Sequence, residues 1–254
     1  MDKLGIALTA AVLLAASPAA PTADEVIQRN IEARGGLAKI KSVQSMRLTG
    51  TMSVEGQDML STLEIKRPNK TRWEFTVEGA TAVQAYDGKT GWTVMPFAGK
   101  TEPESMSADD LKDIELQADM DGPLVGYKAK GNRVELVGRE RVGEREAWRL
   151  RVTLTNGDVR EIYLDVKTNL QFLTVTRRTI EGKEMEVESE IGDYRDVNGV
   201  LLPHSFEARA KGASQKQTLK FDKIELNVPI DDSRFRMPES KKPVEKPDPA
   251  PAVS

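Results

Sequence analysis

The strongest constraint on the fold is a two-residue alternation of apolar and polar side chains. In residues 46–54, the even positions carry Met, Leu, Gly, Met and Val, and the odd positions carry Arg, Thr, Thr and Ser. Successive side chains of a β-strand point to opposite faces of a sheet, so this pattern predicts a strand with one buried and one solvated face. Residues 59–66, 72–77 and 148–154 repeat the pattern. The chain is therefore expected to be mainly β.

Turn sequences between these segments predict how the strands connect. Pro68-Asn69, Asp87-Gly88, Asn156-Gly157 and Asn198-Gly199 are typical of tight turns. Strands joined by tight turns must be antiparallel. A rolled or partly closed sheet leaves fewer exposed edges than a flat one. We expect a mainly β (α+β) fold with about eleven antiparallel strands in an incomplete barrel.

Two short helices are expected to pack across the open side of this sheet. The first is predicted to begin with Asp24 as its N-cap and to end before Gly35-Gly36. The second is predicted to begin at Ser107, within a polar segment that covers residues 98–131. Asp119 and Asp121 lie in that segment without the remaining ligands of a calcium loop, so they are interpreted as solvated loop acids.

The two ends of the chain differ in composition from the part between them. Residues 1–20 combine Lys3, an apolar run and small residues, which is typical of a secretory signal peptide. Residues 239–254 are rich in Pro and Lys and are expected to be a disordered tail. Residues 21–238 are expected to form one domain. The sequence therefore predicts an exported, soluble protein.

The composition excludes several classes of chemistry. The chain has no cysteine, which excludes disulfides, thiolate metal sites and a lipid-bearing cysteine. The net charge is −3, and Lys and Arg are mixed with Asp and Glu along the chain, which argues against a nucleic-acid surface. Gly88-Lys89-Thr90 lacks the first glycine of a phosphate loop. The sole histidine, His204, has no second histidine to share a metal. We therefore expect no enzyme activity, metal or cofactor.

Arg67 lies in line with an apolar strand face. Counting by twos from Met59 gives Ser61, Leu63, Ile65 and then Arg67, just before Pro68 ends the strand. The guanidinium would therefore lie at the rim of the enclosed space, where it would bond backbone carbonyls or a carboxylate. Such bonds could hold a lid shut. The ordinary alternative is an arginine at a strand end, in water.

Several short motifs together resemble a known family. They are I-K-R-P-N at residues 65–69, R-W at 72–73, D-G-K-T at 87–90 with Trp92, and P-F at 96–97. In this combination they resemble the periplasmic outer-membrane lipoprotein carriers of the LolA/LolB-like superfamily. The second half, with Y-L-D at 163–165, resembles the outer-membrane lipoprotein-sorting relatives of these carriers.

The resemblance implies an incomplete β-barrel whose helices cap a hydrophobic cavity for acyl chains. It also implies that Arg67 is the latch that bonds carbonyls of a lid helix in the closed state. The residues expected to line the lipid cavity are Met46, Leu48, Met52, Leu63, Ile65, Trp73, Phe75, Trp92, Met95 and Phe97. For the methionines and Trp73, a role as plain core residues stays open.

The function implied is that of a periplasmic carrier which shields acyl chains during transfer towards the outer membrane. Its partners would be an acylated lipoprotein or a free lipid, with an inner-membrane donor protein and an outer-membrane acceptor protein, and the carrier would be a monomer. One alternative is an envelope sensor or regulatory module that binds lipid or protein on the same fold. A second is an enzyme that uses strand carboxylates, which the absence of a recognisable catalytic set disfavours.

Overall fold

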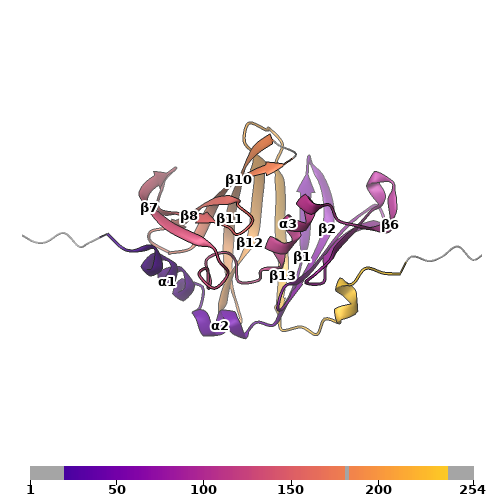
Figure 1. Cartoon of the computed structure of the whole chain (residues 1–254), viewed down its shortest axis with the longest axis horizontal. Helices are drawn as coiled ribbons and strands as arrows, with labels where there is room; N and C mark the ends of the chain where they lie inside the picture. Colours follow the sequence, from indigo (N-terminus) through magenta and orange to yellow (C-terminus); the bar gives the residue numbers. More distant parts are fainter. Residues whose placement is uncertain (1–19, 181–182, 240–254) are drawn as a thin grey trace, which may run out of the picture.

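The computed structural model describes residues 20–180 and 183–239 (Figure 1). The expected signal peptide and the expected C-terminal tail lie outside the described residues, except for Ala20 and Glu239. Thirteen strands of the described chain form one sheet in which every neighbouring pair is antiparallel. The strands are β1 (Ser45–Val54), β2 (Gln57–Lys66), β3 (Lys70–Val77), β4 (Ala80–Tyr86), β5 (Gly91–Met95), β6 (Lys100–Ser105), β7 (Arg133–Val142), β8 (Arg145–Thr153), β9 (Val159–Asp165), β10 (Gln171–Ile180), β11 (Lys183–Val197), β12 (Val200–Ala210) and β13 (Gln217–Leu226).

The order of the strands explains how the sheet acquires a cover. From β1 the chain runs outward strand by strand to β6 at one edge, and from β7 at the other edge it returns strand by strand to β13, which pairs with β1. The segment between β6 and β7 must therefore cross from one edge of the sheet to the other. Figure 1 shows this crossover, with its helix α3 (Ala108–Ala118), lying in front of β1 and β13.

The sheet is open, because β6 and β7 are not paired to each other. The expected mainly antiparallel, incomplete barrel is thus confirmed, although the described chain has thirteen strands where the sequence predicted about eleven. The sequence analysis did not predict either edge strand, β6 or β7. β6 is polar and contains Pro103, and β7 has no fully buried side chain and shifts its pairing register between Leu136 and Gly138. Charges, proline and irregular pairing are typical of strand edges that must not pair with another chain.

The two remaining helices lie at the other end of the concave face. Helix α1 (Ala23–Ala33) begins at Thr22, which forms a capping box with Glu25. The predicted N-cap Asp24 was wrong, since Asp24 lies in the first turn of the helix. Helix α2 (Leu37–Ser42) follows after Gly35 and Gly36, both of which have positive φ angles. The predicted start of α3 at Ser107 is confirmed, because the Ser107 hydroxyl accepts a hydrogen bond from the Asp110 amide.

The main hydrophobic core includes the side chains that α1 buries and continues along the concave face to β1, β2 and β13. Val26, Ile27 and Ile31 of α1 pack with Leu150 and Ile162 of the sheet, and all five side chains are buried. Leu124 and Val125, which follow α3, join the same cluster. The crossover segment is therefore anchored in the core at the point where it approaches β7. No helix among the described residues is long and apolar enough to cross a membrane.

The outer face of the sheet carries a polar network that fixes the C-terminal segment. Glu64 of β2 is almost fully buried and accepts hydrogen bonds from Arg47 at 2.9 Å and from Arg234 at 2.5 Å. Arg234 belongs to the 3₁₀ helix η2 (Asp232–Phe235). The Trp92 indole donates to the Phe235 carbonyl oxygen at 2.9 Å. A buried carboxylate with two guanidinium partners is well compensated, so this face is expected to stay rigid.

A test of the β1–β13 pairing uses Gly50, where the register between these strands shifts. An alanine Cβ at this position would lie 1.9 Å from the Lys220 carbonyl oxygen, a backbone atom that cannot move away. Gly50→Ala is expected to lower the free energy of unfolding by about 2 kcal/mol or more, measured by urea denaturation. In Gly192→Ala, the matched control, the nearest atom is the rotatable Ser205 hydroxyl. Equal losses in both variants would contradict the packing described.

Candidate functional site

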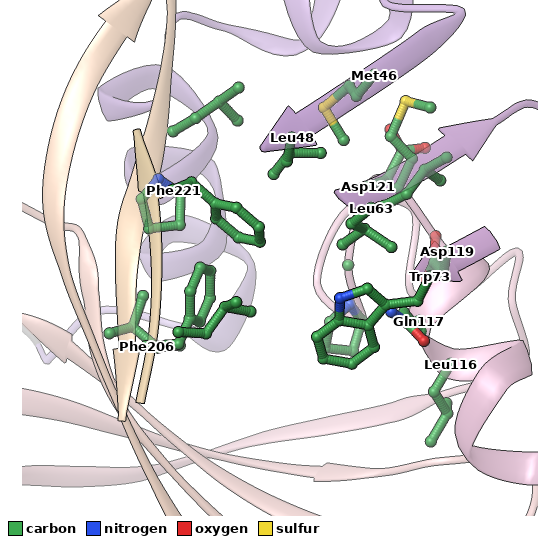
Figure 2. Close-up of a pocket in the computed structure, with 18 of the residues that line it drawn as sticks. Met46, Leu48, Leu63, Trp73, Leu116, Gln117, Asp119, Asp121, Phe206 and Phe221 are labelled. Carbon is green, nitrogen blue, oxygen red and sulfur yellow. The ribbon is translucent and has the colours of Figure 1, made fainter. Parts of the chain in front are cut away.

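The concave face contains a pocket of about 670 Å³ that is open to solvent. Figure 2 shows Leu63 and Trp73, from β2 and β3, on one side and Phe206 and Phe221, from β12 and β13, on the other. The crossover segment forms a further wall with Leu116 of α3 (Figure 2). Strands β2 and β3 thus provide one apolar wall, β12 and β13 provide a second, and the crossover segment provides a third.

Five of the ten residues predicted to line the cavity do line this pocket. They are Met46, Leu48, Leu63, Ile65 and Trp73. Their positions follow from the alternation, because every second side chain of β1, β2 and β3 faces the concave side. The Trp73 indole donates a hydrogen bond to the Ser61 hydroxyl at 2.8 Å, which fixes its ring at the pocket wall.

The structure places the other five outside the pocket lining. Met52 and Phe75 pack with Ala82 in a separate cluster farther along the strands, and Met95 lies against this cluster. Trp92 is buried, and its indole bonds the C-terminal segment. Phe97 is 51% exposed in the short 3₁₀ helix η1 (Pro96–Ala98). Residues 92–97 are largely apolar, with little alternation, so the sequence could not show which of them faces the concave side.

The prediction also missed the wall formed by the last strands. Leu219, Phe221 and Ile224 of β13 line the pocket together with Phe206 of β12. Leu219 and Phe221 alternate as β1 does, and this alternation could have revealed them. Ile224 is out of that phase because the register shifts opposite the bond between Thr49 and Gly50.

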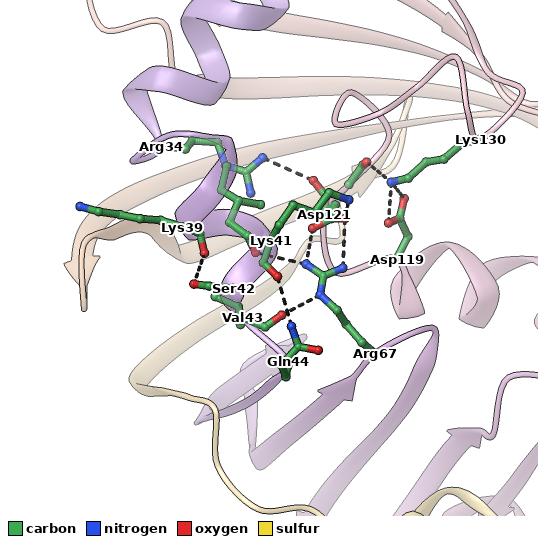
Figure 3. Close-up of polar contacts among 12 residues, drawn as sticks. Arg34, Lys39, Lys41, Ser42, Val43, Gln44, Arg67, Asp119, Asp121 and Lys130 are labelled. Carbon is green, nitrogen blue, oxygen red and sulfur yellow. Dashed lines mark hydrogen bonds and ion pairs between the residues drawn. The ribbon is translucent and has the colours of Figure 1, made fainter.

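Arg67 joins three segments that are far apart in the sequence (Figure 3). Its Nε donates to the Val43 carbonyl oxygen at 2.6 Å, and its Nη2 donates to the Ile40 carbonyl oxygen of α2 at 3.2 Å. Nη1 and Nη2 also donate to the two carboxylate oxygens of Asp121 at 3.1 and 2.6 Å. The strand end, α2 and the loop after α3 are thereby connected through one guanidinium.

Alternation explains why Arg67 points this way. The neighbouring Lys66 side chain lies on the outer face, where it bonds Asp232 and the Ile230 carbonyl oxygen. The next side chain therefore points to the concave side, and the Arg67 backbone amide is held by the Gln44 carbonyl oxygen at 2.9 Å. Only a fifth of the Arg67 side chain is exposed, so its charge is largely removed from water.

The Asp121 carboxylate binds both Arg67 and Lys41. It is only 3% exposed, so the interpretation of this residue as a solvated loop acid was wrong. Lys41 of α2 forms a second ion pair with the same carboxylate. Burial opposes ionisation, but the hydrogen bonds and charges of Arg67 and Lys41 outweigh this effect and lower the pKa of Asp121 to about 2. The carboxylate therefore stays charged at every pH at which the fold is expected to operate.

Polar groups from α1 and the later strands also line the pocket. Asn30, Arg34, Gln171 and Tyr194 belong to this lining. The Asn30 amide donates to the Asn169 carbonyl oxygen at 2.8 Å, and the Tyr194 hydroxyl donates to the Gln171 carbonyl oxygen at 2.8 Å. Burial raises the pKa of Tyr194 to about 12, although the Arg34 charge acts in the other direction.

No cluster of three or more potential metal ligands occurs among residues 20–180 and 183–239. His204 is buried in β12, and its Nδ1 lies 3.1 Å from the Leu202 carbonyl oxygen. The Asp87 carboxylate accepts from the Lys89 and Thr90 amides, so the predicted turn at residues 87–90 forms as expected. The site offers apolar walls and a salt-bridged closure.

The depressed pKa of Asp121 has a consequence for stability against pH. Because the folded-state value lies below the ordinary 3.8, the ionised carboxylate stabilises the fold above pH 3.8, and this stabilisation is lost as the pH falls through about 2. Asp121→Asn is expected to cost about 2 kcal/mol or more of unfolding free energy at pH 7. In urea denaturation, the difference from the parent protein should stay constant down to pH 5 and shrink below pH 4.

Asp232 provides the matched control. Its pKa is also lowered to about 2, by hydrogen bonds from Lys66 and Lys70, but about half of its side chain is exposed. Solvent screens such pairs, so Asp232→Asn should change stability much less than Asp121→Asn. A comparable loss in both variants would show that burial of Asp121 does not matter.

The fold was compared with known proteins. No protein-family model and no curated protein sequence matches the chain. A LolA superfamily protein from Nitrosomonas europaea has a similar structure, with a TM-score of 0.58 and 12% identity over 85% of this chain and 98% of that one. A protein described as an outer-membrane lipoprotein-sorting domain, from Vibrio parahaemolyticus, has a TM-score of 0.59 and 11% identity over 83% and 94% of the two chains.

A third similar structure is that of a DUF1329 family protein from Desulfovibrio piger, with a TM-score of 0.58 and 10% identity over 84% of this chain and 96% of that one. In each of these three cases nearly the whole solved chain is covered. Identities of 10–12% establish the fold. The chain therefore has the fold of the LolA superfamily and of the outer-membrane lipoprotein-sorting proteins, as the sequence motifs predicted.

Proposed function

We propose that this protein is a periplasmic carrier that shields the acyl chains of a lipoprotein or a free lipid during transfer towards the outer membrane. The observation that carries the proposal is the pocket of about 670 Å³ between apolar strand walls, closed on one side by a salt-bridged crossover. Ligand pockets in proteins have volumes of roughly 300–1,000 Å³ and are mostly apolar. The names of the similar structures, which include lipoprotein sorting, support the same class of cargo.

Burial of an acyl chain supplies the driving force for such a carrier. Each methylene transferred from water to an apolar environment gains about 0.8 kcal/mol, so a long acyl chain gains on the order of 10 kcal/mol. That is enough to hold a lipid in solution. It also means that spontaneous release into water is slow, so delivery requires that the cavity open at the acceptor.

The Arg67 network provides a physical means of opening. Arg67 and Lys41 hold the loop at Asp121 against α2, and the same crossover segment forms one wall of the pocket. Hydrogen bonds between charged groups contribute about 1.5–3 kcal/mol each. The bonds stabilise the closed, empty protein, and entry of a lipid must offset them. Arg67 therefore acts as a latch that sets the balance between the closed and the open state.

The pocket can be tested with a fatty acid brominated near the end of its chain, because bromine quenches nearby tryptophan fluorescence. Trp73 lines the pocket, whereas Trp148 does not. Titration is expected to quench fluorescence with saturation, and Trp73→Phe should remove most of the quenching while Trp148→Phe retains it. The result that would sink the proposal is an absence of saturable quenching, or quenching that survives in Trp73→Phe.

The latch can be tested with Arg67→Leu. Removing the latch favours the open state, so the apparent affinity for lipid should rise and release should slow by at least about tenfold. Transfer of a fluorescent acylated peptide from the purified protein to vesicles measures the rate. Lys66→Gln is the matched control, because it removes an adjacent positive charge that lies on the outer face. If Arg67→Leu releases cargo at the same rate as Lys66→Gln, Arg67 is not a latch.

A further inference from the structure

Arg34 is a cation in the pocket wall whose charge is not matched by a described carboxylate. It lines the pocket near the end of α1, and among the described residues no Asp or Glu oxygen lies within 4.0 Å of its guanidinium. Its one described side-chain hydrogen bond runs from Nη1 to the Asp121 main-chain carbonyl oxygen, at 3.4 Å (Figure 3). A guanidinium has five donors, and this hydrogen bond uses one of them.

The nearest carboxylate cannot neutralise Arg34, because it already serves two other cations. Arg67 donates two hydrogen bonds to the Asp121 carboxylate, and Lys41 forms an ion pair with it. Arg34, Lys41 and Arg67 thus surround a single negative charge. Asp119, the next acid along the loop, is held by Lys130 at 2.5–2.6 Å. This end of the pocket therefore carries an excess of positive charge.

The groups beside Arg34 are neutral and cannot compensate it. Burial raises the pKa of Tyr194 to about 12, so its hydroxyl stays protonated. Asn30 and Gln171 carry no charge. Burial lowers the pKa of Arg34 itself, which reflects the cost of placing a guanidinium away from water, although the Asp121 charge acts in the other direction. A buried charge without a partner is costly unless something else supplies the opposite charge.

The pocket lining contains two further acidic residues besides Asp119 and Asp121. Asp110 and Asp113 belong to the first turns of α3, and Asp110 lies about 13 Å along the helix axis from Asp119. The Asp110 carboxylate already accepts a hydrogen bond from the Ser107 hydroxyl. Asp110 and Asp113 thus lie in α3, whereas the two acids at the Arg34 end are held by Arg67, Lys41 and Lys130.

The position of Arg34 is fixed by its backbone. Arg34 is the C-cap of α1, its amide bonds the Asn30 carbonyl oxygen, and its own carbonyl oxygen accepts from the Leu201 amide at 3.0 Å. The next residue, Gly35, has a φ of +110°, and a Cβ there would lie 2.2 Å from the Gly199 carbonyl oxygen. The root of the side chain is therefore held between α1 and the β11–β12 turn, which is the preorganisation that a binding group requires.

We propose that Arg34 binds the anionic headgroup of the cargo lipid, a phosphate or a carboxylate, while the acyl chain lies along the apolar walls. A planar guanidinium donates two parallel hydrogen bonds to such a group, and these bonds are strong because both partners are charged. The inference rests on the proposed lipid-carrier function and adds that the carrier selects amphiphiles with a negative charge next to the chain.

The test compares ligands that share a chain and differ in charge. Dodecyl phosphate and dodecanol are titrated separately against the brominated fatty acid, with Trp73 quenching as the readout. Dodecyl phosphate is expected to bind at least about tenfold more tightly than dodecanol. Inorganic phosphate and acetate, added alone at millimolar concentration, are expected not to displace the probe. Displacement by these free anions would show a general anion site and overturn the headgroup assignment.

Arg34→Gln is expected to reduce the affinity for dodecyl phosphate to that for dodecanol and to leave the affinity for dodecanol unchanged. Lys39→Gln is the matched control, since Lys39 is an exposed cation of the neighbouring helix α2 and does not line the pocket. Its affinities should equal those of the parent. Thermal unfolding checks that both variants are folded, and the ligand comparison in the parent protein tests the inference even if Arg34→Gln does not fold.

The two proposals fail in different ways. If the parent protein binds dodecanol and dodecyl phosphate with equal affinity, the headgroup inference is wrong and the lipid-carrier proposal stands. If neither ligand nor the brominated probe binds, the carrier proposal fails and the headgroup inference with it. A loss of affinity for both ligands in Arg34→Gln would show that Arg34 supports the pocket structurally and does not recognise a charge.

Discussion

The ion pair between Arg67 and Asp121 connects parts of the molecule that the sheet alone would not hold together. The strands are secured by backbone hydrogen bonds, and α1 is secured by buried apolar side chains. The loop after α3 and the end of α2, in contrast, meet through one guanidinium, one carboxylate and Lys41. The nearly buried Asp121 carboxylate needs both cations to compensate its charge. Its ion pairs with Arg67 and Lys41 are therefore expected to form and break together.

The course of the chain explains why such a closure exists at all. Two antiparallel runs of strands that meet at β1 and β13 leave β6 and β7 at opposite edges, and the segment between them has to cross the concave face. That segment covers the concave face because of the strand order. Helix α3 and the polar loop after it supply the side chains of the cover, including Asp121. The pocket is thus a product of the strand order, and its apolar walls are a product of the alternation in β1, β2, β3 and β13.

The sequence predicted those features that depend on local periodicity. Alternation identified the strands, the inward direction of Arg67 and five pocket residues, and the hydrogen-bonding pattern of Ser107 was visible in advance. The partner Asp121 was not predictable, because it lies 54 residues away in a polar segment where nothing local indicates burial. The prediction that Trp92 and Phe97 line the cavity was wrong. Their segment is apolar at successive positions, so the sequence does not show which side chains face the concave side. Long-range pairing, and not local propensity, determines those positions.

The crossover segment is expected to differ from the sheet in its local free energy of unfolding. It is tied to the sheet at both ends, by the bond from the Met106 amide to the Gly91 carbonyl oxygen and by the fully buried Val125. Between these points Ile114 and Ala118 of α3 pack with Tyr86 of β4, and the loop after α3 is held at the pocket rim by the Arg67–Asp121 ion pair. Its opening is therefore a local fluctuation with a free energy below that of global unfolding. The backbone amides of the loop after α3 are therefore expected to exchange with solvent faster than those of the sheet.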